Sequence, residues 1–401
     1  MFSKNYKQNK RRKSLNVITR KIHHMIPQRS VETDKIGDYE LRHGFLNSKK
    51  INRLIIYMRS SGCQWMLDDE KGGCFMCGHI AGTTQGQPIE PRNYINQFDT
   101  IIRSFDFDDI PMLCVYNAGS FFNNNEVPAE ARHQIYKRIN NIKGVKHVIF
   151  ESRPEYICEN ELLTINEQIQ KKIEIGIGFE SSNEYIRQVC LNKGFTLDDY
   201  LIALEKCKKY NIACLAYVLL KPPFLSEFNA IEDSIKSIKW AFQHGVDVVS
   251  LEPVSVQKGT LIHLLYNMNL YRPPWIWSVL KAVKESHTMG HIVRIGGFEF
   301  FPPPSVCTHN CPACNEYCIN EIEKYNATQD ISVINTVLSM ECKTCKHKWN
   351  EIIEKSVSIN ENIDSFLEAF EINQLEKLIR NDLRSYPSSL LRIGACGSPN
   401  L

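Results

Sequence analysis

Short apolar runs alternate with amphipathic stretches between about residue 50 and residue 300. The apolar runs occupy residues 54–58, 112–116, 146–150, 173–179, 213–219, 246–251 and 292–295. Amphipathic helical stretches lie between them, for example at residues 128–140, 197–210 and 230–244. Repeated strand–helix units with buried strands predict an α/β fold, a parallel sheet wholly or partly closed into a barrel. Functional side chains then belong at the carboxyl ends of the strands.

Changes in composition divide the chain into a basic N-terminal arm (1–48), the barrel (49–300), a cysteine-rich module (301–355) that begins at a proline run, and a helical C-terminal segment (356–401). The arm contains Lys4, Lys7, Lys10, Arg11, Arg12, Lys13, Arg20 and Lys21. Two interpretations of the arm are open: it binds nucleic-acid phosphates, or it is a solvated, disordered tail.

Overall composition narrows the class of protein. The 401 residues are 43% hydrophobic and 23% charged, with a net charge of +3, as in ordinary globular proteins. No apolar run approaches the ~20 residues of a membrane span, and the N-terminus lacks the apolar segment of a signal peptide. Many of the 15 cysteines form CxxC pairs, which indicates metal binding in a reducing cytoplasm and no association with a membrane.

Three cysteines follow the first apolar run, at Cys63, Cys74 and Cys77, in a loop rich in glycine. Three thiolates can hold three irons of a [4Fe–4S] cluster and leave the fourth iron free to bind a small molecule. The alternative is a zinc knuckle, in which His79 supplies the fourth ligand that zinc needs.

Polar and small residues follow the later strands, where a molecule docked on such a cluster would lie. Small residues allow backbone contact with an amine or a carboxylate, an acid can hold ribose hydroxyls, and a helix start with an arginine suits a carboxylate. The candidates are Asn117, Gly119 and Ser120 after the second strand, Glu151 after the third, and Glu180, Ser181 and Arg187 after the fourth. Lys221, Glu252 and His79 are candidates for the substrate side.

A second group of cysteines lies near the C-terminus. Cys311 and Cys314 form one CxxC pair, and Cys342 and Cys345 form another, with the spacing of a zinc ribbon. Two such pairs suit a closed tetrahedral zinc site, and a second iron–sulfur cluster remains the alternative.

Several motifs together resemble the radical S-adenosylmethionine (SAM) superfamily. They are the cysteine triad, the 117–121 loop, Glu151-Ser152-Arg153-Pro154, Gly178-Phe179-Glu180-Ser181 and Asn192-Lys193-Gly194-Phe195-Thr196. The resemblance covers about residues 50–300 and is nearest to the Elongator catalytic subunit and the methylthiotransferases. It implies a partial (β/α)6 TIM-like barrel with a zinc-ribbon-like extension. The cofactors that the resemblance implies are a [4Fe–4S] cluster and SAM, whose cleavage yields a 5′-deoxyadenosyl radical.

The spacing of the triad is unusual, since ten residues separate Cys63 from Cys74, and Met76 replaces an aromatic residue before Cys77. The longer loop resembles the archaeosine-forming radical SAM family. That family's C-terminal signature is similar to residues 302–304, 310–314, 325–330 and 342–349. The match therefore covers most of residues 50–350.

This second resemblance implies a role in tRNA modification. Members of the family cleave a carbon–nitrogen bond in a lysine adduct of 7-cyano-7-deazaguanine in the D-arm, and archaeosine results. The implied partners are tRNA, the lysine-transferring synthase subunit and an electron donor such as flavodoxin or ferredoxin. The alternatives are an Elongator-like or methylthiotransferase-like tRNA-modifying enzyme and a non-catalytic protein that binds zinc and RNA. Residues 1–62 contain no cysteine, which disfavours a methylthiotransferase.

Overall fold

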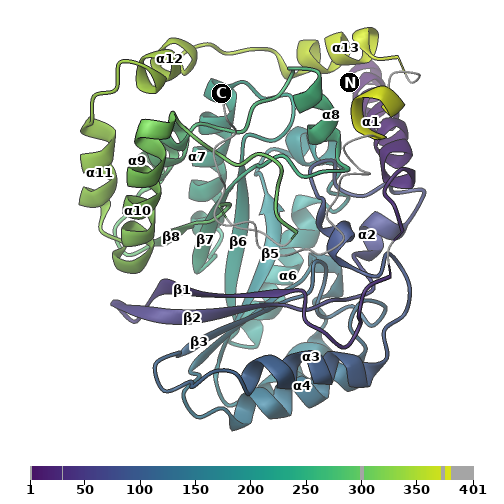
Figure 1. The fold of residues 1–401 in the computed structure, drawn as a ribbon, viewed down its shortest axis with the longest axis vertical. Coiled ribbons are helices and arrows are strands. Elements are labelled where there is room, and N and C mark those ends of the chain that lie inside the picture. The colour runs from purple at the N-terminus through teal and green to yellow at the C-terminus, as the bar shows by residue number, and fades with distance from the viewer. Residues whose placement is uncertain (1, 29, 299–301, 372–374, 381–401) are drawn as a thin grey trace.

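The computed structural model describes residues 2–28, 30–298, 302–371 and 375–380. In this part of the chain eight strands form one curved sheet in chain order (Figure 1). The first pair is antiparallel and every later pair is parallel. The strands are β1 (Asp38–Leu46), β2 (Lys49–Tyr57), β3 (Met112–Tyr116), β4 (His147–Glu151), β5 (Lys172–Glu180), β6 (Ala213–Leu220), β7 (Val248–Pro253) and β8 (Ile292–Ile295). The prediction of a partial α/β barrel is confirmed.

Helices cover the outside of the sheet. They are α3 (Pro91–Ile102), α4 (Ala129–Asn141), α5 (Glu159–Gln168), α6 (Leu197–Lys209), α7 (Glu227–Gln243) and α9 (Ile276–Ser286). Shorter helices follow the strands: α2 (Gln64–Leu67), η1 (His79–Gly82), η2 (Pro154–Tyr156), the π-helix η3 (Ile186–Cys190) and α8 (Leu261–Asn267). Helix α1 (Phe2–His24) precedes the sheet, and the elements that follow it are α10 (Pro312–Thr328), α11 (Ile331–Ser339), α12 (Cys345–Ile352), α13 (Ile359–Ala369) and η5 (Glu376–Arg380).

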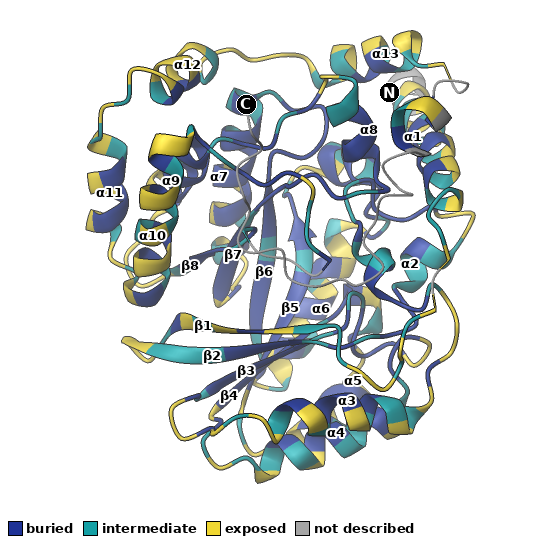
Figure 2. Ribbon diagram, in the orientation of Figure 1, coloured by how far each residue is buried: buried dark blue, intermediate teal, exposed yellow. Residues whose placement is uncertain are grey.

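Most of the sheet is buried (Figure 2), and its buried side chains divide into two clusters. Alternate residues such as Leu54 and Val115 face the helices and belong to the large core. Their neighbours Ile55 and Cys114 belong to a second, smaller cluster inside the curve of the sheet. Side chains alternate between the two faces of a strand, so every second side chain points into the interior of the barrel. Polar residues at the ends of the strands also lie there, and they form the candidate site.

Helix α10 lies against the open edge of the sheet. It contacts β1, β2 and β8. The side chain of Asn326 pairs with the backbone of Ile295, accepting from its N–H and donating to its carbonyl oxygen, both at 2.8 Å. Gln329 accepts from the N–H of Val293 at 3.1 Å. The edge strand β8 is therefore hydrogen-bonded by side chains where another strand would continue the sheet.

Two elements at the N-terminus differ from what the hydrophobic pattern indicates. Strand β1 exposes Tyr39 and Leu41, at 42% and 52%, so its pattern is not that of a buried strand. The basic segment at residues 2–24 forms the helix α1, whose Leu15, Ile18 and Ile22 are buried against the barrel. Of the two interpretations of the arm, the disordered tail is wrong for this helix. None of the described helices combines the length and the apolar character that crossing a membrane requires.

Candidate functional site

The three N-terminal cysteines lie in one loop after β2. Cys63 immediately precedes α2, and Cys74 and Cys77 precede η1. Cys74 is buried and the other two are partly buried. The pKa of Cys63 and that of Cys77 are raised to about 12, mainly by burial and in smaller part by the charge of Cys74, so the three thiols lie close enough to interact. Cys63 and Cys77 must therefore lose their protons before they can ligate a metal.

Asn192 holds the loop from the other side. Its side-chain amide donates to the carbonyl oxygens of Lys71 and Gly73, both at 2.7 Å. The backbone carbonyl oxygen of Asn192 accepts from the indole N–H of Trp65 at 2.8 Å. Asn192 has a φ of 53°, a conformation that asparagine tolerates well. The stretch that begins at Asn192, which carried part of the family resemblance, thus binds the part of the cysteine loop that lies between Cys63 and Cys74.

Glu126 is a site residue that the sequence analysis did not identify. It is fully buried, and its carboxylate accepts from the backbone N–H of Gln64 at 3.0 Å and from the Asn123 amide at 2.9 Å. It also accepts from the N–H of Ser120. Burial raises its pKa, and the three donors oppose the rise. The polar run that contains Glu126 follows the predicted 117–121 loop, and this proximity was the available signal.

The residues predicted after β3 lie beside Cys63. A Cβ atom on Gly119 would be 1.9 Å from the Glu126 carboxylate and 3.3 Å from the Cα of Cys63, so glycine is needed there. The hydroxyl of Ser120 accepts from the N–H of Arg153 at 3.2 Å. Asn117 is fully buried, and within the described part of the chain neither atom of its amide has a hydrogen-bond partner. A buried amide without partners is costly and fits the site of a bound polar molecule.

Glu151 ends β4 and faces the interior of the barrel. The hydroxyl of Tyr217 donates to its carboxylate at 2.6 Å and also lies 3.2 Å from the hydroxyl of Tyr116. Burial raises the pKa of Glu151 to about 7, and the nearby acids Glu252 and Glu180 contribute in the same direction. Glu151, Glu180 and Glu252 therefore lie near one another at the carboxyl ends of the strands.

Glu180 forms an ion pair with Lys193, with 2.6 Å between its carboxylate and Nζ. Both residues are buried. A Cβ atom on Gly178 would be 2.5 Å from Nζ of Lys193, so the small residue leaves room for the pair. The charge of Lys193 also acts on Cys74 and Cys77. This lysine was not among the predicted site residues.

Ser181 and Arg187 follow the carboxyl end of β5, and Ser181 contacts α7. The hydroxyl of Ser181 donates to Asp233 at 2.8 Å, and its carbonyl oxygen accepts from the guanidinium of Arg187 at 2.8 Å. Arg187 is fully buried and also pairs with Glu184. Burial lowers the pKa of Arg187 to about 10, and among the described residues its Nε has no partner. The N–H group at Nε of Arg187 is therefore suited to bind an anionic group.

Arg153 is a second buried cation next to the cysteine loop. Its guanidinium lies over the ring of Trp65, 4.7 Å from the centroid, and 5.4 Å from that of Phe195. It donates to the carbonyl oxygen of Lys193 at 3.0 Å. The charges of Cys63 and Cys74 act on it. Arg153 and Lys193 thus offset negative charge in the loop.

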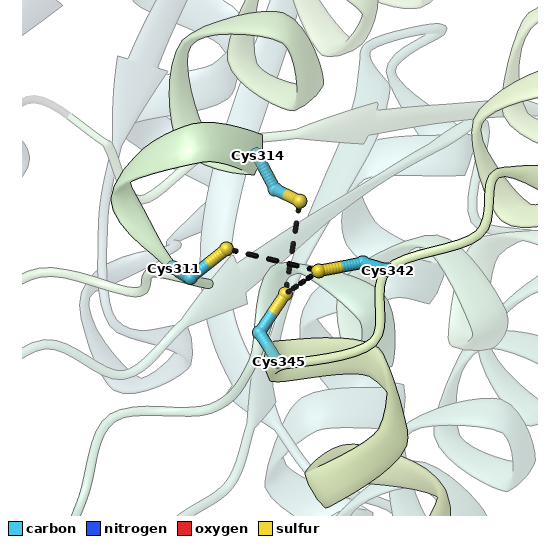
Figure 3. Close-up of side chains that lie close together, drawn as sticks. All are labelled: Cys311, Cys314, Cys342 and Cys345. Atoms are coloured by element: carbon cyan, nitrogen blue, oxygen red, sulfur yellow. Dashed lines mark hydrogen bonds between the residues drawn. The ribbon is translucent and has the colours of Figure 1, made fainter.

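The four C-terminal cysteines come together in space, as Figure 3 shows. Their sulfur atoms all lie within 4.8 Å of one another, and three pairs are 3.4, 3.7 and 3.9 Å apart. Among the described residues, this is the one group in which three or more such ligand atoms come so close. The set comprises Cys311, Cys314, Cys342 and Cys345, as the spacing predicts.

The surroundings of this group favour metal binding. A hydrogen bond from the Thr344 hydroxyl lowers the pKa of Cys342 to about 5, so one thiolate is present at neutral pH. The indole N–H of Trp277 donates to the sulfur of Cys345 at 3.3 Å. Such outer donors fix and stabilise ligating sulfur atoms.

A buried chain of hydrogen bonds connects this region with the end of β6. Trp349 of α12 donates to the hydroxyl of Ser278 at 2.8 Å, and that hydroxyl donates to Glu227 at 2.5 Å. Glu227 forms an ion pair with Lys221, with 2.6 Å between their charged atoms. Lys221 directly follows β6. The cysteine group is therefore joined to a strand end at the barrel opening.

Comparison with known proteins gives close relatives in sequence, although no family model matches. The chain is 37% identical over 309 residues to an uncharacterised protein of Methanocaldococcus jannaschii (75% of this chain, 82% of that protein). It is 31% identical over 310 residues to archaeosine synthase subunit beta of Methanosarcina acetivorans (77% and 87%). The corresponding subunit of Thermococcus kodakarensis is 31% identical over 287 residues (71% and 87%).

Similar solved structures are more distant. They include queuine lyase from Clostridium spiroforme, at 21% identity and a TM-score of 0.39, which covers 53% of this chain and 78% of that one. The archaeal Elp3 of Methanocaldococcus infernus has 15% identity and a TM-score of 0.43, with 58% and 59% covered. Methylornithine synthase has 13% identity and a TM-score of 0.43, with 72% and 77% covered. These scores are too low to add to the argument.

Proposed function

The chain belongs to the archaeosine synthase subunit beta family, a radical SAM family, and on that premise we propose that it is the radical lyase of archaeosine formation. The proposed substrate is tRNA whose D-arm carries a lysine adduct of 7-cyano-7-deazaguanine. The enzyme cleaves a carbon–nitrogen bond of the lysine part, and the formamidine group of archaeosine remains on the base. The lysine-transferring subunit is the proposed partner, because it supplies this substrate.

The residues after β2 and β3 fit the two cofactors that this reaction needs. Cys63, Cys74 and Cys77 would hold three irons of a [4Fe–4S] cluster and leave the fourth for SAM. Asn117 and Arg187 each offer a buried polar group without a partner, which suits the amine or the carboxylate of SAM. When bound, the cluster and SAM supply a 5′-deoxyadenosyl radical to the substrate.

Other residues of the chain hold and shield this site. Glu126 fixes Gln64 and Ser120 through their backbone N–H groups, so the cysteine loop and the loop after β3 keep their relative positions. Gly119 allows the close approach of the two loops. The role proposed for Glu151 is to accept hydrogen bonds from ribose hydroxyls, and the role proposed for Lys193, which pairs with Glu180, is to lower the energy of negative charge on the cysteine thiolates. The buried aromatic and aliphatic core around these groups excludes water.

We propose that the C-terminal cysteines bind one zinc ion. Zn–S bonds of about 2.3 Å in a tetrahedron place sulfur atoms about 3.8 Å apart. The Sγ–Sγ separations of 3.4, 3.7 and 3.9 Å support one ion more than a second iron–sulfur cluster, whose several metal atoms would separate the ligands further. A flavodoxin or ferredoxin is the proposed reductant, and the reducing cytoplasm is the proposed location.

The observation that carries the proposal is the cysteine loop itself, clamped at the carboxyl end of β2 in a member of this family. The test begins with anaerobic reconstitution with iron and sulfide. We expect a [4Fe–4S]⁺ EPR signal that shifts when SAM is added, and formation of 5′-deoxyadenosine. The Cys74→Ala variant should form none, whereas Cys158→Ala, which removes an exposed cysteine outside the site, should behave like wild type.

The second stage tests the substrate. The reconstituted enzyme is given tRNA that carries the lysine adduct, and the nucleosides are analysed by mass spectrometry for archaeosine. Cleavage of SAM without archaeosine would favour an Elongator-like or methylthiotransferase-like reaction. Wild-type SAM cleavage by Cys74→Ala, or zinc without any iron–sulfur cluster, would overturn the enzyme assignment and leave a zinc protein that binds RNA.

A further inference from the structure

Helix α1 has two chemically different faces. The inward face carries Leu15, Ile18 and Ile22, all buried, together with Arg11 and Arg12. The outward face carries exposed lysines at positions 7, 10, 13 and 21. Residues 2–24 contain no aspartate or glutamate. The helix therefore packs by one side and presents positive charge, without acids of its own, on the other.

The inward face holds the cysteine loop. Nε of Arg12 donates to the side-chain oxygen of Asn192 at 2.9 Å, and Asn192 in turn binds the loop at Lys71 and Gly73, just before Cys74. Asn16 donates to the carbonyl oxygen of Glu70 at 3.3 Å. A Cβ atom on Gly72 would be 1.8 Å from the Asn16 side-chain oxygen, so helix and loop are in close contact. Docking of α1 and order in the loop are thus parts of one arrangement.

The contacts of α1 place the helix beside the opening of the barrel, with its lysines on the exposed side. The helix contacts η3, which follows β5, and α8, which follows β7 (Figure 1). Both elements lie at the carboxyl ends of the parallel strands. Arg11 also forms a two-pronged ion pair with Asp364 of α13, at 2.7 and 2.6 Å. The lysines are therefore held at a fixed place on the rim of the site.

The four lysines lack partners of their own. Within the described part of the chain, none of Lys7, Lys10, Lys13 and Lys21 forms an ion pair with an acid. The first and last are 14 positions apart, which is about 21 Å along a helix. A row of positive charges of that length can follow a nucleic-acid backbone past several phosphates, and a solvated face would more often mix both signs of charge.

We propose that the outward face of α1 binds phosphates of the tRNA and that this binding stabilises the cysteine loop. The inference rests on the proposed function, because it takes tRNA as the substrate. RNA that binds the docked helix and not the undocked one shifts the equilibrium toward the docked state. Through Arg12 and Asn192, the same shift keeps the loop closed around the cluster.

The test compares two variants with equal changes of charge. The first converts Lys7, Lys10, Lys13 and Lys21 to glutamine. The control converts Lys137, Lys172, Lys208 and Lys239, which are exposed on other elements of the barrel, to glutamine. Circular dichroism and thermal unfolding establish that both variants fold. Binding of adduct-bearing tRNA to reconstituted enzyme is then measured over a range of salt concentrations.

We expect the α1 variant to lose at least about tenfold in affinity at ~0.1 M salt, and its log–log salt slope to fall by about 3. The control should retain both values. Bound tRNA should slow removal of iron by a chelator in wild type and in the control, and not in the α1 variant. Wild-type binding by the α1 variant, or equal losses in both variants, would overturn the inference. If wild type itself neither binds nor converts the tRNA, the proposed function fails instead.

Discussion

At the residue scale, single side chains connect segments that are far apart in sequence. Asn192 binds Lys71 and Gly73 with its two amide hydrogens and accepts from Arg12 with its oxygen, so one residue joins η3, the cysteine loop and α1. Each of these bonds is buried or partly buried, and a carbonyl left without its donor costs about 1–3 kcal/mol. The geometry of the loop therefore depends strongly on this amide.

Asn192→Asp tests that dependence. The carboxylate keeps the acceptor for Arg12 and removes both donors, so the carbonyl oxygens of Lys71 and Gly73 then face negative charge. We expect a reconstituted protein that loses iron to a chelator several times faster than wild type. Asn211→Asp is the matched control, because Asn211 has a similar φ of 56° and is exposed. Equal rates of iron loss in wild type and Asn192→Asp would contradict the clamp.

Glu151 makes a prediction about pH. Burial raises its pKa to about 7, whereas in the unfolded chain the value is near 4.5. Between these values the native state holds the proton more tightly, so the free energy of unfolding falls as the pH rises toward 7. From pH 5.5 to pH 8 the contribution is about 2 kcal/mol. Glu151→Gln removes it.

Urea denaturation of the metal-free protein at both pH values measures this effect. We expect Glu151→Gln to gain stability relative to wild type as the pH is raised. Glu167→Gln, a change at an exposed glutamate, should show no such gain. A difference between wild type and Glu151→Gln that is the same at pH 5.5 and pH 8 would show that the carboxyl group does not titrate with a raised pKa.

At the element scale, the barrel strands and helices were predictable and several of their supports were not. Each buried parallel strand is an apolar run, so the sequence pattern alone locates it. β1 is an edge strand with exposed Tyr39 and Leu41, and its pattern is therefore mixed. In α1 the apolar positions Leu15, Ile18 and Ile22 are few and lie among lysines.

The candidate site also contains some residues that could be predicted from the sequence and others that could not. Glu151 and Glu180 were predictable because they end strands, and position at a strand end is a local property. Glu126 and Lys193 were not, because their roles depend on groups that the fold brings from other segments. The Asn326–Gln329 motif, recognised as a family signature, gained a physical role only when it was found against β8.

The cysteine group between α10 and α12 gives a prediction at this scale. Cys342→Ser removes the ligand with the lowest pKa, so metal is lost and α10 and α12 are no longer joined. We expect a loss of at least about 3 kcal/mol in the free energy of unfolding, because a structural metal contributes its binding free energy to folding. Cys158→Ser, at an exposed cysteine, should leave stability unchanged.

Tryptophan fluorescence separates loss of metal from general unfolding. Trp277 donates to the sulfur of Cys345, so its emission should change when the metal leaves. The change should be absent from a Trp277→Phe protein that still binds metal. If Cys342→Ser binds as much zinc as wild type, the four-cysteine site is wrong.

At the scale of the whole molecule, helices α1 and α13, which are far apart in sequence, lie in contact. Arg11 of α1 and Asp364 of α13 are separated by 353 positions in sequence, and their side chains form two hydrogen bonds. Arg11 is mostly buried and Asp364 is about half exposed. The N-terminal helix is thus fixed by the barrel on one side and by the C-terminal segment on the other. Removing either contact should loosen α1 and, through Asn192, the cysteine loop.

A double-mutant cycle measures how strongly Arg11 of α1 and Asp364 of α13 are coupled. Arg11→Ala, Asp364→Ala and the double variant are compared with wild type by urea denaturation. We expect a coupling energy of about 1 kcal/mol, because a two-pronged, half-buried pair exceeds the 0.3–0.5 kcal/mol typical of exposed pairs within a helix. The exposed pair Lys236–Glu232 of α7, at 3.3 Å, gives the reference value. Hydrogen exchange in residues 2–24 should be faster in Arg11→Ala and in Asp364→Ala alike, since each variant breaks the same contact. A coupling no larger than that of the reference pair, with unchanged exchange, would mean that the barrel alone holds α1 in place.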